Sequence, residues 1–203
     1  NIPAKVLSKW IIGNIKWSNV REYYEHLESL PIGPNVASFI GHSNIRIDAM
    51  GLDGAFMRPK ATDAELFKME GIVAEAMQAG YLGMSIDMLP FHRWAGEYEK
   101  KYLGISVPSQ RAAKSEYRRL AHVLRNHNRV LQITPNAVDK TSFATILRLS
   151  HGGFFKPSLK TSIVAALDLK SNENIYKVLK FYGALSNNVM RANMKFQTLA
   201  EPF

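Results

Sequence analysis

The sequence contains no cysteine. This absence excludes disulfides, thiolate metal ligands and cysteine nucleophiles, and it is compatible with a reducing compartment, so we expect a cytoplasmic protein. No apolar run approaches the roughly 20 residues of a membrane span, and the start of the sequence lacks the pattern of a signal peptide. We therefore expect no membrane partner. With 46% apolar and 21% charged residues, the 203 residues have the composition of an ordinary globular domain.

Several catalytic and nucleotide-binding patterns are also missing. We find no Ser-His-Asp set, no phosphate-cradling glycine loop and no dinucleotide fingerprint, because Gly51-Leu52-Asp53-Gly54 has the wrong spacing. The sequence therefore gives no support to a serine hydrolase, a nucleotide-dependent enzyme or a dinucleotide-dependent one.

The charge is strongly unbalanced, at +9. Arg111, Lys114, Arg118 and Arg125 lie along one stripe of a predicted helix, and the simplest interpretation is a solvated outer face. A nucleic-acid surface would need aromatic or glycine-rich elements beside this stripe, or a recognisable binding module, and neither is present. We expect no nucleic-acid partner.

Short apolar runs alternate with segments of helical periodicity along the whole sequence. Strands are predicted at 36–40, 81–86, 130–133, 162–167 and 194–199, and helices at 17–30, 62–80, 113–124, 143–147 and 175–182. Thr62 and Glu65 form a capping box at the start of one helix, and Gly80 provides its left-handed end. Gly183 is predicted to end the last helix.

This alternation predicts an α/β fold with right-handed βαβ crossovers, at least four parallel strands and helices on the outside. Five strands are fewer than the eight of a TIM-type barrel, the first predicted element is a helix, and the first residue is Asn1. We therefore expect residues 1–203 to form a single (β/α) segment of a larger barrel domain. The remainder of the barrel would come from the same protein.

Candidate site residues follow the predicted strands, where α/β folds bind ligands. His42 comes directly after the strand at 36–40, and Ser85 ends the strand at 81–86. His92 and Arg93 lie in the following loop. We predict catalytic roles for His42 and His92 and substrate contacts for Ser85 and Arg93, with all four side chains in one pocket. An arginine here suits a substrate carboxylate, although His42 could instead lock its loop through the backbone and His92-Arg93 could lie in an ordinary surface loop.

Two further charged positions have alternative interpretations. Arg46 is predicted to contact substrate, through a bound anion, but it could also pair with Asp48. Asp87, at the end of the second strand, is more typical of a loop-capping group, although it could accept a proton.

The stretches GPNVASFIGHSNIRIDAMG and RPKATDAELFKMEGIVAEAMQAGYLGMSID resemble the central part of N-acyl-D-amino-acid deacylases, the D-aminoacylase branch of the amidohydrolase superfamily. In that family an aromatic-led helix, here 17–30, precedes a strand ending in Gly-His, and an arginine follows a few residues on. LPFHRWAG, VPSQRAAKSEYRRLAHVLRN and RVLQITPN resemble longer members of the same group. The resemblance is strongest over 17–87 and weakens after 136.

The resemblance implies a metal-dependent hydrolase that cleaves the linear amide bond of an N-acyl amino acid with metal-activated water. It also implies zinc, bound by a His-x-His pair, histidines of the middle strands and a late aspartate. This sequence has no His-x-His, and the two middle strand ends read QITP at 132–135 and LDLK at 167–170. We therefore assign no metal ligand in this chain and expect the zinc ligands to lie mostly outside it.

Two classes of function remain open from the sequence. The first is an amidohydrolase acting on C–N bonds, with an N-acyl amino acid as its small-molecule substrate. The second is a non-catalytic or divergent barrel relative that binds a small carboxylate-bearing ligand.

Overall fold

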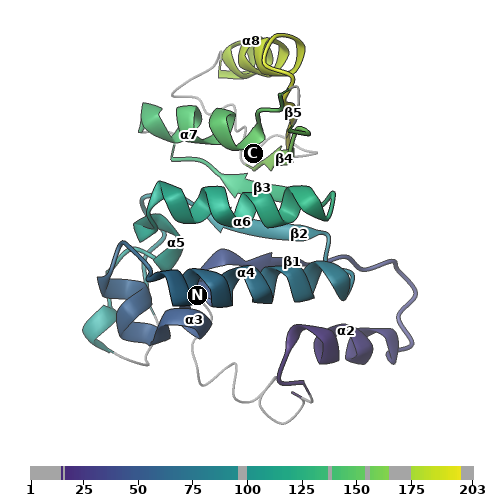
Figure 1. Cartoon of the computed structure of the whole chain (residues 1–203), viewed down its shortest axis with the longest axis vertical. Helices are drawn as coiled ribbons and strands as arrows, with labels where there is room; N and C mark the ends of the chain where they lie inside the picture. Colours follow the sequence, from purple (N-terminus) through teal and green to yellow (C-terminus); the bar gives the residue numbers. More distant parts are fainter. Residues whose placement is uncertain are drawn as a thin grey trace.

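The computed structural model describes residue 15 and residues 17–95, 100–136, 139–153, 156–164 and 175–197. Five strands form one sheet in the order β1-β2-β3-β4-β5, and every neighbouring pair is parallel (Figure 1). The strands are β1 (Phe39–Gly41), β2 (Gly83–Asp87), β3 (Val130–Thr134), β4 (Lys160–Ile163) and β5 (Asn193–Phe196). Among the strands described, β1 and β5 form the two edges.

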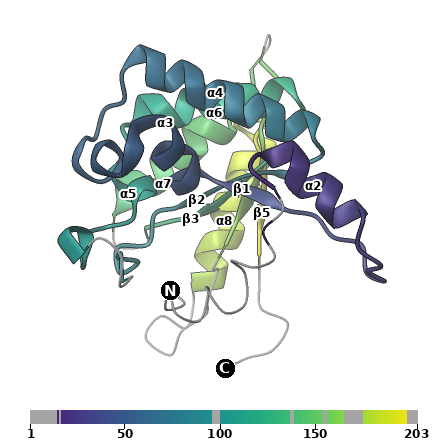
Figure 2. The same ribbon diagram turned by 90° about the horizontal axis from the view of Figure 1, so that it is seen from below.

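Among the described helices, the first precedes β1 and the others connect successive strands of the sheet. In chain order, these helices are α2 (Val20–Glu28), α3 (His42–Met57), α4 (Asp63–Gln78), α5 (Pro108–Arg111), α6 (Lys114–Asn126), α7 (Lys140–Ser150) and α8 (Ile175–Asn188). In Figure 1, α4, α6, α7 and α8 follow one another in the same order as the strands, and Figure 2 shows α4 and α6 together on one side of β1, β2 and β3.

Strand order and helix placement together define the fold class. When each parallel strand lies beside the next one in sequence, right-handed crossovers place the intervening helices on the same face of the sheet, as in a (β/α) barrel. A doubly wound sheet would reverse its strand order and carry helices on both faces. The predicted α/β fold, part of a TIM-type barrel, is confirmed, as is the parallel pairing of the first two strands.

The hydrophobic core lies between the sheet and these helices. Alternate strand residues contribute to it, because successive side chains of a strand point to opposite faces. The strands supply Ile40, Met84, Ile86, Leu131, Ile133, Ile163 and Met194, and the helices supply Leu66, Met69, Val73, Leu120, Leu124 and Ile146. The other alternate residues of each strand therefore face away from the helices, and we call this side the open face of the sheet.

The start and the end of α4 confirm two local predictions. The Thr62 side chain accepts a hydrogen bond from the Glu65 amide, and the Glu65 side chain accepts one from the Thr62 amide, as in a capping box. Gly80, just after the helix, has a φ of +107°, which side chains with a Cβ rarely adopt.

Helix α3 was not predicted, β1 begins at Phe39 rather than at 36, and the end of α8 differs from the sequence analysis. The segment after Gly41 enters a helix at His42 rather than a turn, with a kink at Gly51, whose φ is +70°. Helix α8 continues through Gly183, which was predicted to end it. A glycine fits at this position because a Cβ would lie 3.0 Å from the Phe196 ring. The predicted ends of two strands, at 167 and 199, lie outside the described residues. No described helix is both long enough and apolar enough to cross a bilayer.

Candidate functional site

A row of polar side chains crosses the open face of the sheet near the carboxyl ends of the strands. The strand register places Gly41 beside Ser85, Ser85 beside Gln132, Gln132 beside Ser162 and Ser162 beside Lys195. Neighbouring strands lie about 4.8 Å apart, so these side chains form a continuous polar strip. The Gln197 side chain donates a hydrogen bond of 2.8 Å to the Ser162 hydroxyl.

A second row of polar side chains lies two residues further along β2 and β3, nearer their carboxyl ends. Asp87 of β2 is in register with Thr134 of β3. Asp87 Oδ1 accepts a hydrogen bond of 2.9 Å from the Leu89 amide, and Asp87 Oδ2 lies 2.5 Å from His92 Nδ1. The capping role considered for Asp87 is thus present, and the same carboxylate also holds the His92 ring.

The Asp87–His92 pair is suited to proton transfer. A carboxylate on Nδ1 fixes the orientation of the imidazole and leaves Nε2 for a substrate or a water molecule. Both side chains are accessible, with exposed fractions of 35% for Asp87 and 51% for His92. The loop that carries His92 is also held by α5, because the Gln110 side chain donates a hydrogen bond of 2.8 Å to the His92 carbonyl.

Arg93 points toward a different region of the carboxyl edge. Its backbone forms an isolated antiparallel bridge with Ser106, and its Nη1 donates a hydrogen bond of 2.9 Å to the Gly104 carbonyl. The side chain lines a cavity that also contains Met88 and Asn136, the residues just beyond β2 and β3. Arg93 therefore lies between the following helices, whereas Asp87 holds the His92 side chain at the carboxyl end of β2.

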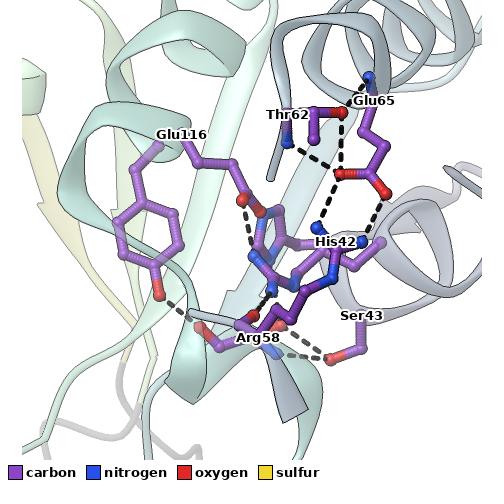
Figure 3. Close-up of polar contacts among 9 residues, drawn as sticks. His42, Ser43, Arg58, Thr62, Glu65 and Glu116 are labelled. Carbon is purple, nitrogen blue, oxygen red and sulfur yellow. Dashed lines mark hydrogen bonds and ion pairs between the residues drawn. The ribbon is translucent and has the colours of Figure 1, made fainter. Parts of the chain in front are cut away.

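His42 is fully buried and belongs to a polar cluster between α3, α5 and α6. Its Nδ1 lies 3.2 Å from the Ser109 hydroxyl, and its Nε2 lies 2.9 Å from Glu116 Oε1, at an angle that is poor for a hydrogen bond. Figure 3 shows the Glu116 carboxylate directed toward His42. The Ser43 and Ser109 hydroxyls are 2.7 Å apart, and the Tyr117 hydroxyl donates to the Ser109 carbonyl.

Arg46 completes this buried polar cluster. Its Nη1 lies 2.5 Å from Glu116 Oε2, and its Nη2 donates a hydrogen bond of 2.7 Å to the Arg58 carbonyl. The exposed fractions of the Arg46 and Glu116 side chains are 0% and 1%. The predicted contacts of Arg46 with Asp48 or with a bound anion are therefore wrong: Asp48 pairs with Lys68 instead, and no anion can reach a guanidinium without exposed surface.

Burial sets the charge states in the cluster. Desolvation lowers the pKa of His42, and the Glu116 contact opposes this only in part, so the ring is held neutral. Desolvation alone would raise the pKa of Glu116, but the contacts with His42 and Arg46 lower it overall. The cluster is thus an Arg46–Glu116 ion pair beside a neutral histidine.

The expected convergence of four side chains in one pocket is not found. Ser85 lies on the open face, and Asp87 holds His92 at the end of the same strand. His42 instead faces the helical layer, where its ring packs against Tyr117 with centroids 5.3 Å apart. The physical reason is helix α3, whose first residue is His42: the chain turns from β1 into the helical layer without a loop over the carboxyl edge. In the part of the chain that the structure describes, His42 therefore faces no pocket at the carboxyl edge.

The predicted basic stripe on α6 also differs in part. Arg125 is buried, with an exposed fraction of 8%, and donates a hydrogen bond of 2.6 Å to the Leu149 carbonyl at the end of α7. Arg118 is exposed, as expected for a solvated face. Arg111 and Lys114 line the same cavity as Arg93.

The sequence analysis did not single out Gln132, Ser162 or Lys195 as site residues. Their signal was the alternation of side chains along each strand, which places every second residue on one face, combined with the parallel register between strands. The register itself is a tertiary property, so the sequence of a single strand does not predict it.

The residues present do not form a zinc site by themselves. Structural and catalytic zinc sites use three or four protein ligands. No group of three His, Cys, Asp or Glu side chains with suitable spacing occurs within the described residues. On the open face, β3 and β4 present Gln132, Thr134 and Ser162, none of which is a usual zinc ligand.

Comparison with known proteins gives relatives by sequence. Uncharacterized proteins of Mycobacterium bovis and Mycobacterium tuberculosis are 33% identical to this chain over 207 aligned residues, which cover 100% of the chain and 33% of each relative. The chain thus spans about a third of the length of the curated relatives it matches. No family model matches the sequence.

Comparison with solved structures gives relatives by fold. A D-aminoacylase with a binuclear metal centre superposes with a TM-score of 0.67 at 17% identity, covering 99% of this chain and 38% of the other. N-acyl-D-glutamate deacylase from Bordetella bronchiseptica, complexed with zinc and a phosphonate inhibitor, superposes with a TM-score of 0.63 at 19% identity, covering 89% and 34%. At this level of identity the likeness shows a shared fold alone, and the chain corresponds to about a third of each of these two proteins.

Proposed function

We propose that the protein is an amidohydrolase that cleaves the amide bond of an N-acyl amino acid. The observation that carries this proposal is the Asp87–His92 pair, accessible on the open face at the carboxyl edge of a barrel-type sheet. Chemistry in (β/α) barrels is performed at this edge. The shared fold with N-acyl-D-amino-acid deacylases supports the choice of reaction.

In this proposal His92 transfers a proton while Asp87 keeps its ring oriented. The imidazole Nε2 takes a proton from the attacking water and returns it to the leaving amine nitrogen. Ser85 and Gln132, neighbours in the polar row, would contact the acyl group or the amide of the substrate. Zinc ligands would come mostly from outside this chain, and the roles proposed here for the described residues are proton transfer and substrate contact.

The test measures release of free amine from a panel of N-acyl-D- and N-acyl-L-amino acids by the intact protein. His92→Gln and Asp87→Asn should each lower kcat by about 10²-fold or more, with a smaller change in KM, because proton transfer of this kind contributes about 10²–10⁴-fold. His122→Gln is the matched control, since His122 is an exposed histidine of α6. Equal kcat values for His92→Gln and the control would contradict the assignment.

A second candidate function is binding without turnover. It is favoured by the side chains of β3 and β4 on the open face, which are not usual zinc ligands. In that case the intact protein would bind N-acyl amino acids, as measured by calorimetry, and release no amine from any member of the panel.

A further inference from the structure

A cavity of about 430 Å³ lies outside the open face, between the starts of α6 and α7. Met88, just after β2, and Asn136, shortly after β3, form part of its wall, and Ala112 and Asp139 lie at the two helix starts. The cavity therefore opens at the carboxyl edge of the sheet, within the helical layer.

The cavity concentrates positive charge. Arg93, Arg111 and Lys114 line it, and among the described residues of the lining Asp139 is the only acidic one. The Asp139 carboxylate is already engaged, because it accepts hydrogen bonds of 2.8 Å from the Thr141 amide and 2.7 Å from the Thr141 hydroxyl. Asp139 therefore caps α7, and its charge also interacts with Lys114, so one carboxylate offsets only part of the positive charge of the three cations.

Arg111 lacks an ion-pair partner in the part of the chain that the structure describes. Lys114 lies near Asp139, whose pKa is lowered by the Thr141 hydrogen bonds and further by the Lys114 charge. Arg111 Nε is buried and makes no hydrogen bond. The ion pairs among the described residues include neither Arg111 nor Lys114. A buried guanidinium nitrogen without an acceptor is costly, since polar groups removed from water are normally hydrogen-bonded. The Arg111 guanidinium as a whole lines the cavity, so an anion bound there would offset its unpaired charge.

The start of α6 adds to this preference for an anion. Its N-cap residue is Ala113, which has no side chain able to accept from the first-turn amides. These amides carry the partial positive charge of the helix dipole, which favours negative ligands. The Ser106 hydroxyl, also in the lining, offers a further donor.

We propose that this cavity, lined by Arg93, Arg111 and Lys114, binds the oxyanion group of a small molecule, either a carboxylate or a phosphate. Arg111 would contact the oxyanion through its guanidinium fork, and Lys114 would contribute a point charge from the rim. The site is separate from the Asp87–His92 pair and does not depend on hydrolysis.

The experiment measures binding by the intact protein with calorimetry at low ionic strength, using inorganic phosphate in one arm and N-acetylglycine in the other. Tighter binding of phosphate identifies a phosphorylated ligand, and tighter binding of N-acetylglycine identifies a carboxylate ligand. In both cases Arg111→Gln combined with Lys114→Gln should weaken binding at least tenfold. Added salt should weaken binding to the wild type.

Three variants separate loss of the site from loss of the fold. Lys114→Gln alone changes an exposed side chain and should still weaken binding while leaving the melting temperature unchanged. Arg111→Lys keeps the charge but not the guanidinium fork, and it should bind more weakly than the wild type and more tightly than Arg111→Gln. Arg118→Gln removes an exposed charge from the same helix outside this cavity and should leave binding unchanged. Binding of neither probe to the wild type, or equal binding by wild type and double variant, would overturn the proposal.

Discussion

The neutral His42 ring makes the stability of the protein depend on pH. Burial lowers its pKa below the ordinary value of 6.5, so between 6.5 and the folded pKa the unfolded chain binds a proton that the folded chain does not. The free energy of unfolding therefore falls as the pH decreases below about 6.5, with a limit of about 1.4 kcal/mol per pH unit. We expect His42→Gln to flatten this slope.

The measurement is the free energy of unfolding by urea from pH 7.5 to pH 5. His122→Gln, which changes an exposed histidine, should keep the slope of the wild type. Identical slopes for His42→Gln and the wild type would show that His42 does not titrate differently in the folded and unfolded states.

The Arg46–Glu116 pair gives a second prediction at the scale of single residues. Glu116→Gln leaves a buried guanidinium without its anion, so we expect a loss of about 3–5 kcal/mol in the free energy of unfolding. The double variant Arg46→Met/Glu116→Leu should lose less than Glu116→Gln alone, because both charges are removed together. The exposed Lys68–Asp48 pair is the control, and Lys68→Ala should change stability little.

The buried polar cluster also shows where sequence interpretation fails at this scale. A histidine directly after a strand has the same local pattern whether it enters a loop or a helix. Glu116 belongs to α6, 70 residues beyond Arg46 in the sequence, and nothing in either local segment indicates their contact. The role of Asp87 was partly predictable, because a carboxylate at the end of a strand caps the loop and His92 is only five residues away.

At the scale of elements, Gly83 marks a close approach of two strands. A Cβ built on Gly83 would lie 1.7 Å from the Val130 carbonyl oxygen, so β2 and β3 would have to separate to accept any side chain. We expect Gly83→Ala to lower the free energy of unfolding by about 2–4 kcal/mol. Thermal denaturation followed by circular dichroism measures the change.

Gly71 is the matched control for this prediction. It lies within α4, and no atom lies within 4 Å of the Cβ that an alanine would add. Gly71→Ala should therefore raise stability by about 0.5–1 kcal/mol, since alanine favours the helical backbone over glycine. A similar change in the two variants would contradict the close approach at Gly83.

Elements with a regular hydrophobic period were predictable, and α3 was not. Helices α4 and α6 have apolar residues at helical spacing, and α4 begins with a capping box, so local sequence indicates both. Helix α3 contains Gly51 at a kink and begins after Gly41 without a side-chain cap. Its two halves are held by tertiary contacts, including those of His42 and Arg46, rather than by local preference.

At the scale of the whole molecule, we expect the two candidate histidines to be independent of metal binding. The intact protein should hold the same zinc content after dialysis when His42 or His92 is replaced by alanine. His42 is buried against Ser109 and Glu116, and in the proposed mechanism His92 Nε2 serves the reacting water while Nδ1 contacts Asp87. Elemental analysis by mass spectrometry measures the content. Loss of zinc in His92→Ala would identify His92 as a ligand.

The sheet as a whole was predictable from sequence, and the polar rows on it were not. Alternation of strands and helices along the sequence predicts parallel strands. Because the crossover connections between such strands are right-handed, it also predicts that the helices cover the outside of the sheet. The neighbours of Ser85 and Gln132, however, follow from the strand register. The register is the alignment of one strand relative to the next, and it is set by tertiary packing. The cavity beside Arg111 and Lys114 depends further on the relative placement of two helix starts.

The strand order also governs how the molecule can assemble. Each strand pairs with the strand that immediately precedes it in the chain, in the order β1 to β5. During synthesis the chain leaves the ribosome from its amino end at about 5–20 residues per second. The strand that pairs with each new strand has therefore been synthesised before it. The sheet can therefore grow by successive addition at one edge, and β5 is the growing edge when residue 197 has emerged.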